Sequence, residues 1–183
     1  MSVWAIADLH LSFATANKSM ALFGSHWENH PEKIRNYWEQ LITDEDLVLI
    51  AGDISWASKL EQALADLEWI DSLPGTKVMI RGNHDYWWPS LKKLQTHLPK
   101  SIHAIHNSSF TWNDVSISGS RLWDTQEYNF SHLRPLSGKP FIPPEVDLEE
   151  QEKIFSRELQ RLEISLQKMD PNTSLRLVMT HYP

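Results

Sequence analysis

"RGNHDYWW", residues 81–88, follows directly on the short apolar run 77–80 and is the most informative stretch of the chain. It places an amide, an imidazole and a carboxylate side by side at Asn83, His84 and Asp85. Asn and Asp bond their own backbone in turns and Gly tolerates unusual dihedral angles, so a turn without chemical function is one interpretation. A site built for chemistry is the other. The rest of the chain separates the two.

Four apolar runs predict buried strands, and each ends in side chains that can bind a metal or carry a proton. The runs cover residues 2–8, 46–53, 76–82 and 174–181, and they end in Asp8-Leu9-His10, Gly52-Asp53, Gly82-Asn83-His84-Asp85 and Thr180-His181. They are nearly continuous rather than alternating, which is typical of strands covered on both faces. Ligands of open α/β sheets gather at the carboxyl ends of the strands. We therefore expect Asp8, His10, Asp53, Asn83 and His181 to meet at one edge.

The remaining pattern predicts an α/β fold in a single domain over residues 1–183. Further strands are expected at 101–107, 108–114 and 114–123, with a hairpin turn at Asn113-Asp114. Helices are expected at 31–42, at 60–73 and from Asp147 to before Asp170; the last carries one apolar stripe of Leu148, Phe155, Leu159, Leu162, Leu166 and Met169. Residues 11–30 and 124–146 fit neither element, and loops of that length are functional or disordered.

Composition excludes several classes of function. The formal net charge of −7 argues against sequence-blind nucleic-acid binding, which needs clustered Lys and Arg. No cysteine is present, which excludes disulfides and thiolate zinc sites and fits a cytoplasmic protein. The N-terminus has no signal-peptide pattern, and no apolar run approaches the roughly 20 residues that span a bilayer. We expect a soluble protein that does not enter membranes.

The five expected ligands offer carboxylate, amide and imidazole atoms and no sulfur. Such a set suits Mn²⁺, Fe²⁺, Zn²⁺, Co²⁺ or Ni²⁺. Five ligands exceed the three that a single catalytic zinc usually takes. They suit two ions about 3.5–4 Å apart that share a bridging carboxylate, for which Asp53 is the candidate.

These motifs together resemble the calcineurin-like metallophosphoesterases, and most closely the bacterial predicted phosphohydrolases of that superfamily, through "AGDISWA" (51–57) and "IRGNHDYWW" (80–88). The resemblance implies a two-sheet α-β-β-α sandwich with helices outside. It assigns one metal to Asp8 and His10 and the other to Asn83 and His181, with Asp53 bridging them; His84 is a general acid or charge stabiliser toward substrate, and Asp85 orients it. The implied reaction is hydrolysis of phosphomonoesters or phosphodiesters by a metal-bridging hydroxide, most readily with two Mn²⁺ ions.

The family carries a further Gly-His-x-His motif after the strand that ends in His181, and this motif does not occur in the 183 residues. Three explanations remain open: a chain cut short, ligands from another chain, or lost activity. We expect the first, which leaves the second sheet incomplete with apolar surface exposed. The alternative function is an interaction module that keeps the fold and is impaired in catalysis.

The substrate is expected to be a small phosphate ester. Arg121, Trp123 and Trp88 lie at or after predicted strand ends and are the candidate substrate-binding residues. A surface salt bridge for Arg121 and core packing for the tryptophans are the competing interpretations. Oligomeric state, native metal and substrate identity leave no signature in the sequence.

Overall fold

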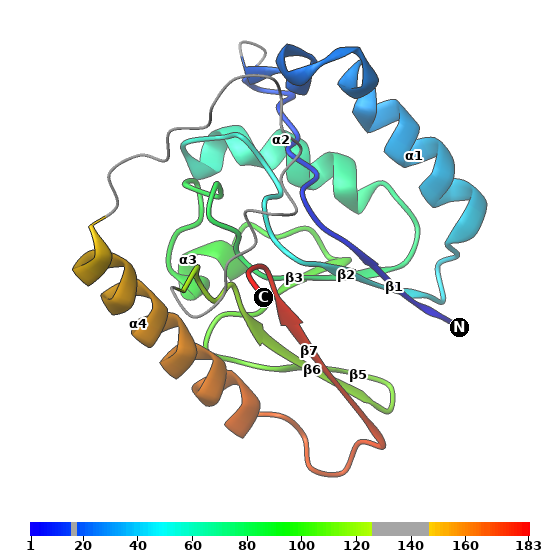
Figure 1. The fold of residues 1–183 in the computed structure, drawn as a ribbon. Coiled ribbons are helices and arrows are strands. Elements are labelled where there is room, and N and C mark those ends of the chain that lie inside the picture. Colours follow the sequence, from blue (N-terminus) through cyan, green and yellow to red (C-terminus); the bar gives the residue numbers. More distant parts are fainter. Residues whose placement is uncertain (16–17, 126–146) are drawn as a thin grey trace.

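The computed structural model describes residues 1–15, 18–125 and 147–183 (Figure 1). Its first sheet is parallel, in the order β1-β2-β3-β4, and consists of β1 (Val3–Ile6), β2 (Leu47–Ile50), β3 (Thr76–Met79) and β4 (Ile102–Ala104). The second sheet has the order β5-β6-β7 and consists of β5 (Phe110–Trp112), β6 (Val115–Ser120) and β7 (Leu175–Thr180). All seven strands fall inside the predicted runs. Most of the stretch expected as a loop at 124–146 lies outside the described residues.

The second sheet mixes strand directions. β5 and β6 are antiparallel, and the partners Trp112 and Val115 leave Asn113 and Asp114 as the two-residue turn, which confirms the predicted hairpin. Asn113 has φ of 51°, the left-handed conformation that such turns need and that Asn tolerates. β7 joins β6 in parallel, with its other edge open among the described residues.

The helices cover the two sheets from outside. They are α1 (His30–Leu41), α2 (Leu60–Asp71), the short α3 (Leu91–Gln95) and α4 (Leu148–Gln167). α1 begins with Pro31 in its first turn, where a missing N–H costs nothing. The Asp147 side chain caps α4 by accepting from the N–H groups of Glu149 and Glu150, both at 3.1 Å. None of these helices, within the part of the chain described, is long and apolar enough to cross a membrane.

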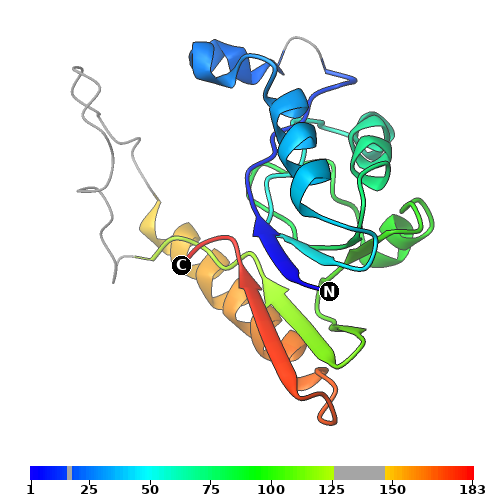
Figure 2. The same ribbon diagram turned by 90° about the vertical axis from the view of Figure 1, so that its right-hand side faces the viewer.

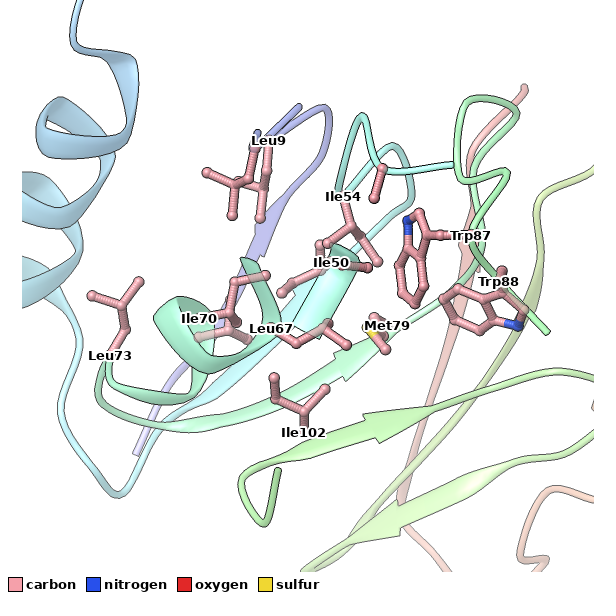
Figure 3. Packing of buried hydrophobic residues seen from close by; sticks show 14 of the residues in the cluster. Leu9, Ile50, Ile54, Leu67, Ile70, Leu73, Met79, Trp87, Trp88 and Ile102 are labelled. Atoms are coloured by element: carbon pink, nitrogen blue, oxygen red, sulfur yellow. The ribbon is translucent and has the colours of Figure 1, made fainter. Parts of the chain in front are cut away.

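Two buried clusters hold the layers together. The larger lies between α1, α2 and the first sheet and includes Leu67, Ile70, Ile50 and Met79 (Figure 3). The smaller lies between the two sheets, where Leu49 and Val78 meet Ile117 and Met179. Successive residues of β2 thus enter opposite clusters, as a strand covered on both faces requires. This α-β-β-α layering confirms the predicted fold class.

α4 packs against the second sheet (Figure 2). Its buried residues are Glu158 and Ser165, whereas Leu148, Leu159 and Leu166 are 55%, 41% and 39% exposed. Ser165 accepts from the Gly119 N–H at 2.9 Å, so the contact is hydrogen-bonded. The apolar periodicity predicted the helix correctly. Of its apolar stripe, Phe155, Leu162 and Met169 are partly buried and the other three residues are exposed. Leu175 and Val178 of β7 are exposed as well.

The stretch 11–30 holds two short 3₁₀ helices that the sequence pattern did not reveal. They are η2 (Met20–Phe23) and η3 (Ser25–Trp27). The Ser19 hydroxyl caps η2 by accepting from the Ala21 N–H at 3.2 Å. Both elements lie beside the carboxyl ends of β1 and β2, which are followed by the predicted ligands Asp8, His10 and Asp53 (Figure 1).

Candidate metal centre

Asp8, His10 and Asp53 meet at the carboxyl ends of β1 and β2. Nε2 of His10 lies 3.6 Å from Asp8 Oδ1 and 3.6 Å from Asp53 Oδ2. All three ligand atoms lie within 4.8 Å of one another, close enough to hold one metal ion. His10 and Asp53 are buried, and the facing His10 side chain lowers the pKa of Asp8, which keeps its carboxylate ionised. The part of the chain described therefore contains a candidate metal site at Asp8, His10 and Asp53.

The backbone of this group is unusual. Asp8, His10 and Asp53 have φ of 58°, 45° and 52°, in the left-handed region that residues other than Gly rarely adopt. Backbone hydrogen bonds hold these residues in that conformation. The Asp8 N–H donates to the Gly52 carbonyl oxygen at 3.1 Å, and the His10 N–H donates to the Asp53 carbonyl oxygen at 2.9 Å. Strained backbone of this kind persists where surrounding structure enforces it, and it concentrates at functional sites.

Asn83 and His181 lie on the other side of Asp53. Nδ1 of His181 is 2.8 Å from the carbonyl oxygen of Ala51, so in the neutral ring Nδ1 carries the hydrogen and Nε2 keeps its lone pair. That Nε2 lies 2.8 Å from Asn83 Oδ1 and 3.6 Å from Asp53 Oδ1. With Nε2 unprotonated, all three atoms carry lone pairs and no hydrogen, so they repel one another unless a cation lies between them. The three atoms therefore fit as ligands of a second divalent ion.

Two glycines let these loops approach each other. A Cβ at Gly82 would lie 2.2 Å from the Asp53 backbone nitrogen and 2.2 Å from its Oδ1. Gly52 has φ of 92°, and a Cβ there would lie 2.9 Å from His181 Nδ1. The sequence suggested a tight turn as the reason for Gly82; the structure shows that close approach of Asp53 is the reason.

Asp85 accepts hydrogen bonds from the loops after β2 and β3 rather than bonding to His84. Its Oδ1 accepts from the N–H groups of Ile54 and Ser55 at 2.9 and 3.1 Å, and its Oδ2 from the Gly82 N–H at 2.7 Å. The Trp87 indole N–H also donates to Oδ1, at 2.9 Å. Burial raises the pKa of Asp85, and the hydrogen bonds from Gly82 and Ser55 oppose that rise. These bonds correct the expectation that Asp85 orients His84, because both oxygens point into the loop backbones.

His84 itself lies at the mouth of the site. Its backbone N–H donates to Asp53 Oδ1 at 2.8 Å, which holds it beside the metal ligands. Its ring centroid is 5.8 Å from that of His10 and 4.9 Å from that of Trp56. Trp56 also stacks on His10, with centroids 4.6 Å apart and planes 18° from parallel. Trp56 thus supports both histidines.

A pocket of about 570 Å³ opens over the metal ligands. Besides those ligands it is lined by His84 and by five large side chains, Met20, Phe23, Trp27, Trp56 and Tyr182. None of these five side chains was among the substrate-binding candidates predicted from the sequence. The only available signal for Tyr182 was its place next to His181, and the residues of η2 and η3 gave none.

The three residues expected to bind substrate take other places. Trp88 is 6% exposed and belongs to the core between the helices and the first sheet, which corrects that assignment (Figure 3). Arg121 pairs with Glu158, Nε to Oε1 at 3.2 Å, so it forms a salt bridge as in the competing interpretation, but a buried one rather than one on the surface. The guanidinium of Arg121 lies over Trp123, with Cζ 4.5 Å from the ring centroid. The Trp123 ring also contacts Tyr182 at the edge of the pocket.

A buried acid behind the site also escaped the sequence analysis. Asp66 of α2 accepts from the Ser55 hydroxyl and, at 2.9 Å, from the Phe13 N–H. Burial raises the pKa of Asp66. It links the loop after β1 to the loop after β2, which carry Asp8, His10 and Asp53.

Comparison with known proteins agrees with this geometry. The family model for calcineurin-like phosphoesterases matches residues 1–183. The Gene 66 protein of Mycobacterium phage D29 is 34% identical over 84 residues, 46% of this chain and 40% of the phage protein, so the matched part spans well under half of that relative. The uncharacterized protein MJ1445 of Methanocaldococcus jannaschii is 27% identical over 144 residues, 78% of this chain and 76% of that protein. Among solved structures, protein AQ665 of unknown function from Aquifex aeolicus gives a TM-score of 0.44 at 18% identity over 87% of this chain and 75% of that one.

Neither the archaeal relative nor the Aquifex protein has a described activity in its name, so the family model carries the assignment. It covers the four strand ends at which Asp8, His10, Asp53, Asn83 and His181 meet. The chain belongs to the calcineurin-like phosphoesterase family.

Proposed function

We propose that this protein hydrolyses phosphate esters at a centre of two divalent metal ions, with Mn²⁺ as the preferred ion. The observation that carries the proposal is the orientation of Asp53. Its Oδ2 faces His10 and its Oδ1 faces His181, each at 3.6 Å. A carboxylate with a histidine on each oxygen is the arrangement of a bridging ligand. Asp8 and His10 would hold one ion, and Asn83 and His181 the other.

Two divalent cations held by these residues would offset the phosphate's negative charge and make a water molecule a better nucleophile. Hydrolysis breaks the bond between phosphorus and the ester oxygen as water adds to phosphorus, so the leaving alkoxide needs a proton. His84 lies beside the ligands without belonging to the Asp8-His10-Asp53 group. We assign to it the donation of that proton, or charge stabilisation of the same oxygen. Asp85 serves indirectly, because it fixes the backbone on which Asp53 and His84 lie.

The size of the pocket and the composition of the chain also suggest a substrate class and a cell compartment. The substrate is a phosphate ester, and the pocket size of about 570 Å³ suits a small molecule. A reducing compartment such as the cytoplasm suits a chain without cysteine.

The test is turnover of p-nitrophenyl phosphate and of bis-p-nitrophenyl phosphate with Mn²⁺, Fe²⁺, Co²⁺, Zn²⁺ or Ni²⁺ added to the chelator-treated protein. We expect metal-dependent hydrolysis of at least one ester, fastest with Mn²⁺, and its loss in the Asp53→Asn variant. The Asp44→Asn variant is the matched control, because Asp44 is an exposed acid before the start of β2, whereas Asp53 follows the end of that strand. No turnover with any of the five metals would contradict the proposal and favour an interaction module.

A further inference from the structure

The pocket over the metal ligands has two unlike walls. One wall is polar and consists of the ligands and His84. The other consists of Met20, Phe23, Trp27, Trp56 and Tyr182. Phe23 lines the pocket and is 64% exposed, so part of its ring is accessible to a ligand.

The apolar wall is attached firmly to the loops that carry the ligands. The Trp56 indole nitrogen lies 3.3 Å from the Met20 sulfur, which joins η2 to the loop after β2. Lys18 donates to the Trp56 carbonyl at 3.0 Å. Nε2 of buried His30 lies 3.0 Å from the carbonyl oxygen of Leu9, the residue between Asp8 and His10 in the sequence. These contacts give η2 and η3 a fixed place beside the metal centre.

The charge of the pocket restricts what can bind there. Among the described residues that line it, none is Lys or Arg. The two nearby cations have other partners: Lys18 bonds the Trp56 carbonyl and the Ser58 hydroxyl, and Arg121 pairs with Glu158. Among the pocket-lining groups in the part of the chain described, bound metal ions would be what offsets the charge of a phosphate. A second phosphate or a carboxylate on the organic part of the substrate would lose water without gaining a partner, which is unfavourable.

We infer that the substrate is a monophosphate ester of an uncharged, apolar alcohol that contains a flat ring. The phosphate would lie at the metal ligands and the ring between Phe23, Trp27 and Trp56. Ring faces stack favourably on such side chains and bury a large apolar area. This inference rests on the proposed function, since the metal centre fixes the place of the phosphate.

Binding of phosphonates that cannot be hydrolysed tests the inference apart from turnover. Calorimetry with the Mn²⁺-loaded protein would compare phenylphosphonate with methylphosphonate. We expect phenylphosphonate to bind at least about 10-fold more tightly, because its ring reaches the apolar wall. Phe23→Ala should reduce the affinity for phenylphosphonate about 10-fold and leave that for methylphosphonate unchanged. Trp27→Ala is a second variant with the same expected pattern.

Leu22→Ala is the matched control. Leu22 precedes Phe23 in η2 and is 78% exposed, yet it does not line the pocket, so its removal should change neither affinity. Equal affinities for the two phosphonates, or no binding of either, would overturn the inference. An aryl preference in a protein that hydrolyses no nitrophenyl ester would contradict the proposed hydrolysis and still show ring binding at the apolar wall, so the two failures are distinguishable.

Discussion

Asp53 is the residue on which both halves of the site depend. Its Oδ2 faces His10 and its Oδ1 faces His181. Oδ1 also accepts a hydrogen bond from the backbone N–H of His84. Only Gly at position 82 lets it come so close, because a Cβ there would overlap its backbone nitrogen and Oδ1. Removal of Asp53 should therefore disturb metal binding and the loop of His84 together.

His84→Ala separates proton donation from metal binding. If His84 serves the leaving group, the variant should keep its metal content while turnover falls by roughly 10²–10⁴-fold, the usual effect of a positioned general acid. The defect should shrink for nitrophenyl esters, whose leaving groups need little protonation. Elemental analysis beside steady-state rates on good and poor leaving groups is the measurement.

Asp53→Ala is the comparison for that variant, since it should lose metal and activity together. Loss of a metal from His84→Ala would show that His84 is a ligand. An equal defect for good and poor leaving groups would show that it does not donate the proton.

Residue types at strand ends were enough to predict which side chains meet, because parallel strands bring their carboxyl ends to one edge. Asp8, His10, Asp53, Asn83 and His181 lie together for that reason. The direction of a side chain inside a turn does not follow from its neighbours along the chain. Spacing alone therefore could not show that Asp85 bonds the backbone of Ile54, Ser55 and Gly82 rather than His84.

At the scale of elements, periodicity identified the helices but not how α4 packs. Glu158 is buried against the second sheet because Arg121 and Arg161 pair with it, at 3.2 and 2.6 Å. Such a partnered charge can occupy a buried face, which a reading based on hydrophobic positions misses. The helices η2 and η3 have three or four residues each, too few for any periodic signal.

The start of β1 and the start of β2 are joined by one carboxylate, which gives a pH-dependent prediction. Asp46 accepts from the Ser2 N–H at 2.5 Å and from the Thr43 N–H and hydroxyl at 2.9 and 3.0 Å. The Thr43 N–H bond is the largest of the effects that lower the pKa of Asp46 from 3.8 to about 2. Since the folded pKa is the lower one, the ionised group stabilises the fold above the unfolded value.

The wild-type protein should therefore exceed Asp46→Asn in the free energy of unfolding at neutral pH. That excess should be complete above a pH of about 4 and should fade as pH falls toward about 2. Urea unfolding of both proteins across this range measures it. Asp44→Asn, at an exposed neighbouring position, should show no such difference. An excess that grows as the pH falls would contradict the assignment.

For the whole molecule, the proposed metal ligands follow four strands of two sheets. Asp8 follows β1, Asp53 follows β2, Asn83 follows β3, and His181 follows β7 of the second sheet. Like-charged and lone-pair groups gather at this edge, and a bound cation would hold the two sheets together there. Metal binding should thus report on global stability and not only on activity.

The last prediction concerns the thermal midpoint. A ligand that binds only the folded state at 100 times its Kd adds about 2.7 kcal/mol, which corresponds to roughly 5–10 °C for a chain of this size. We expect Mn²⁺ at saturating concentration to raise the Tm of the chelator-treated protein by that amount, measured by scanning calorimetry. Asp53→Asn should remove most of the shift, because the amide keeps an acceptor for the His84 N–H but carries no charge to bridge two ions.

The control variant shows whether the shift comes from this site. Asp44→Asn removes the same charge from an exposed position, so it should retain the full Mn²⁺ shift. His181→Ala should reduce the shift without abolishing it, because Asp8, His10 and Asp53 can still hold one ion. A shift that survives in Asp53→Asn would mean that Mn²⁺ stabilises the fold from elsewhere. A shift lost entirely in His181→Ala would mean that the two halves of the site bind metal only together, which would contradict an independent group at Asp8, His10 and Asp53.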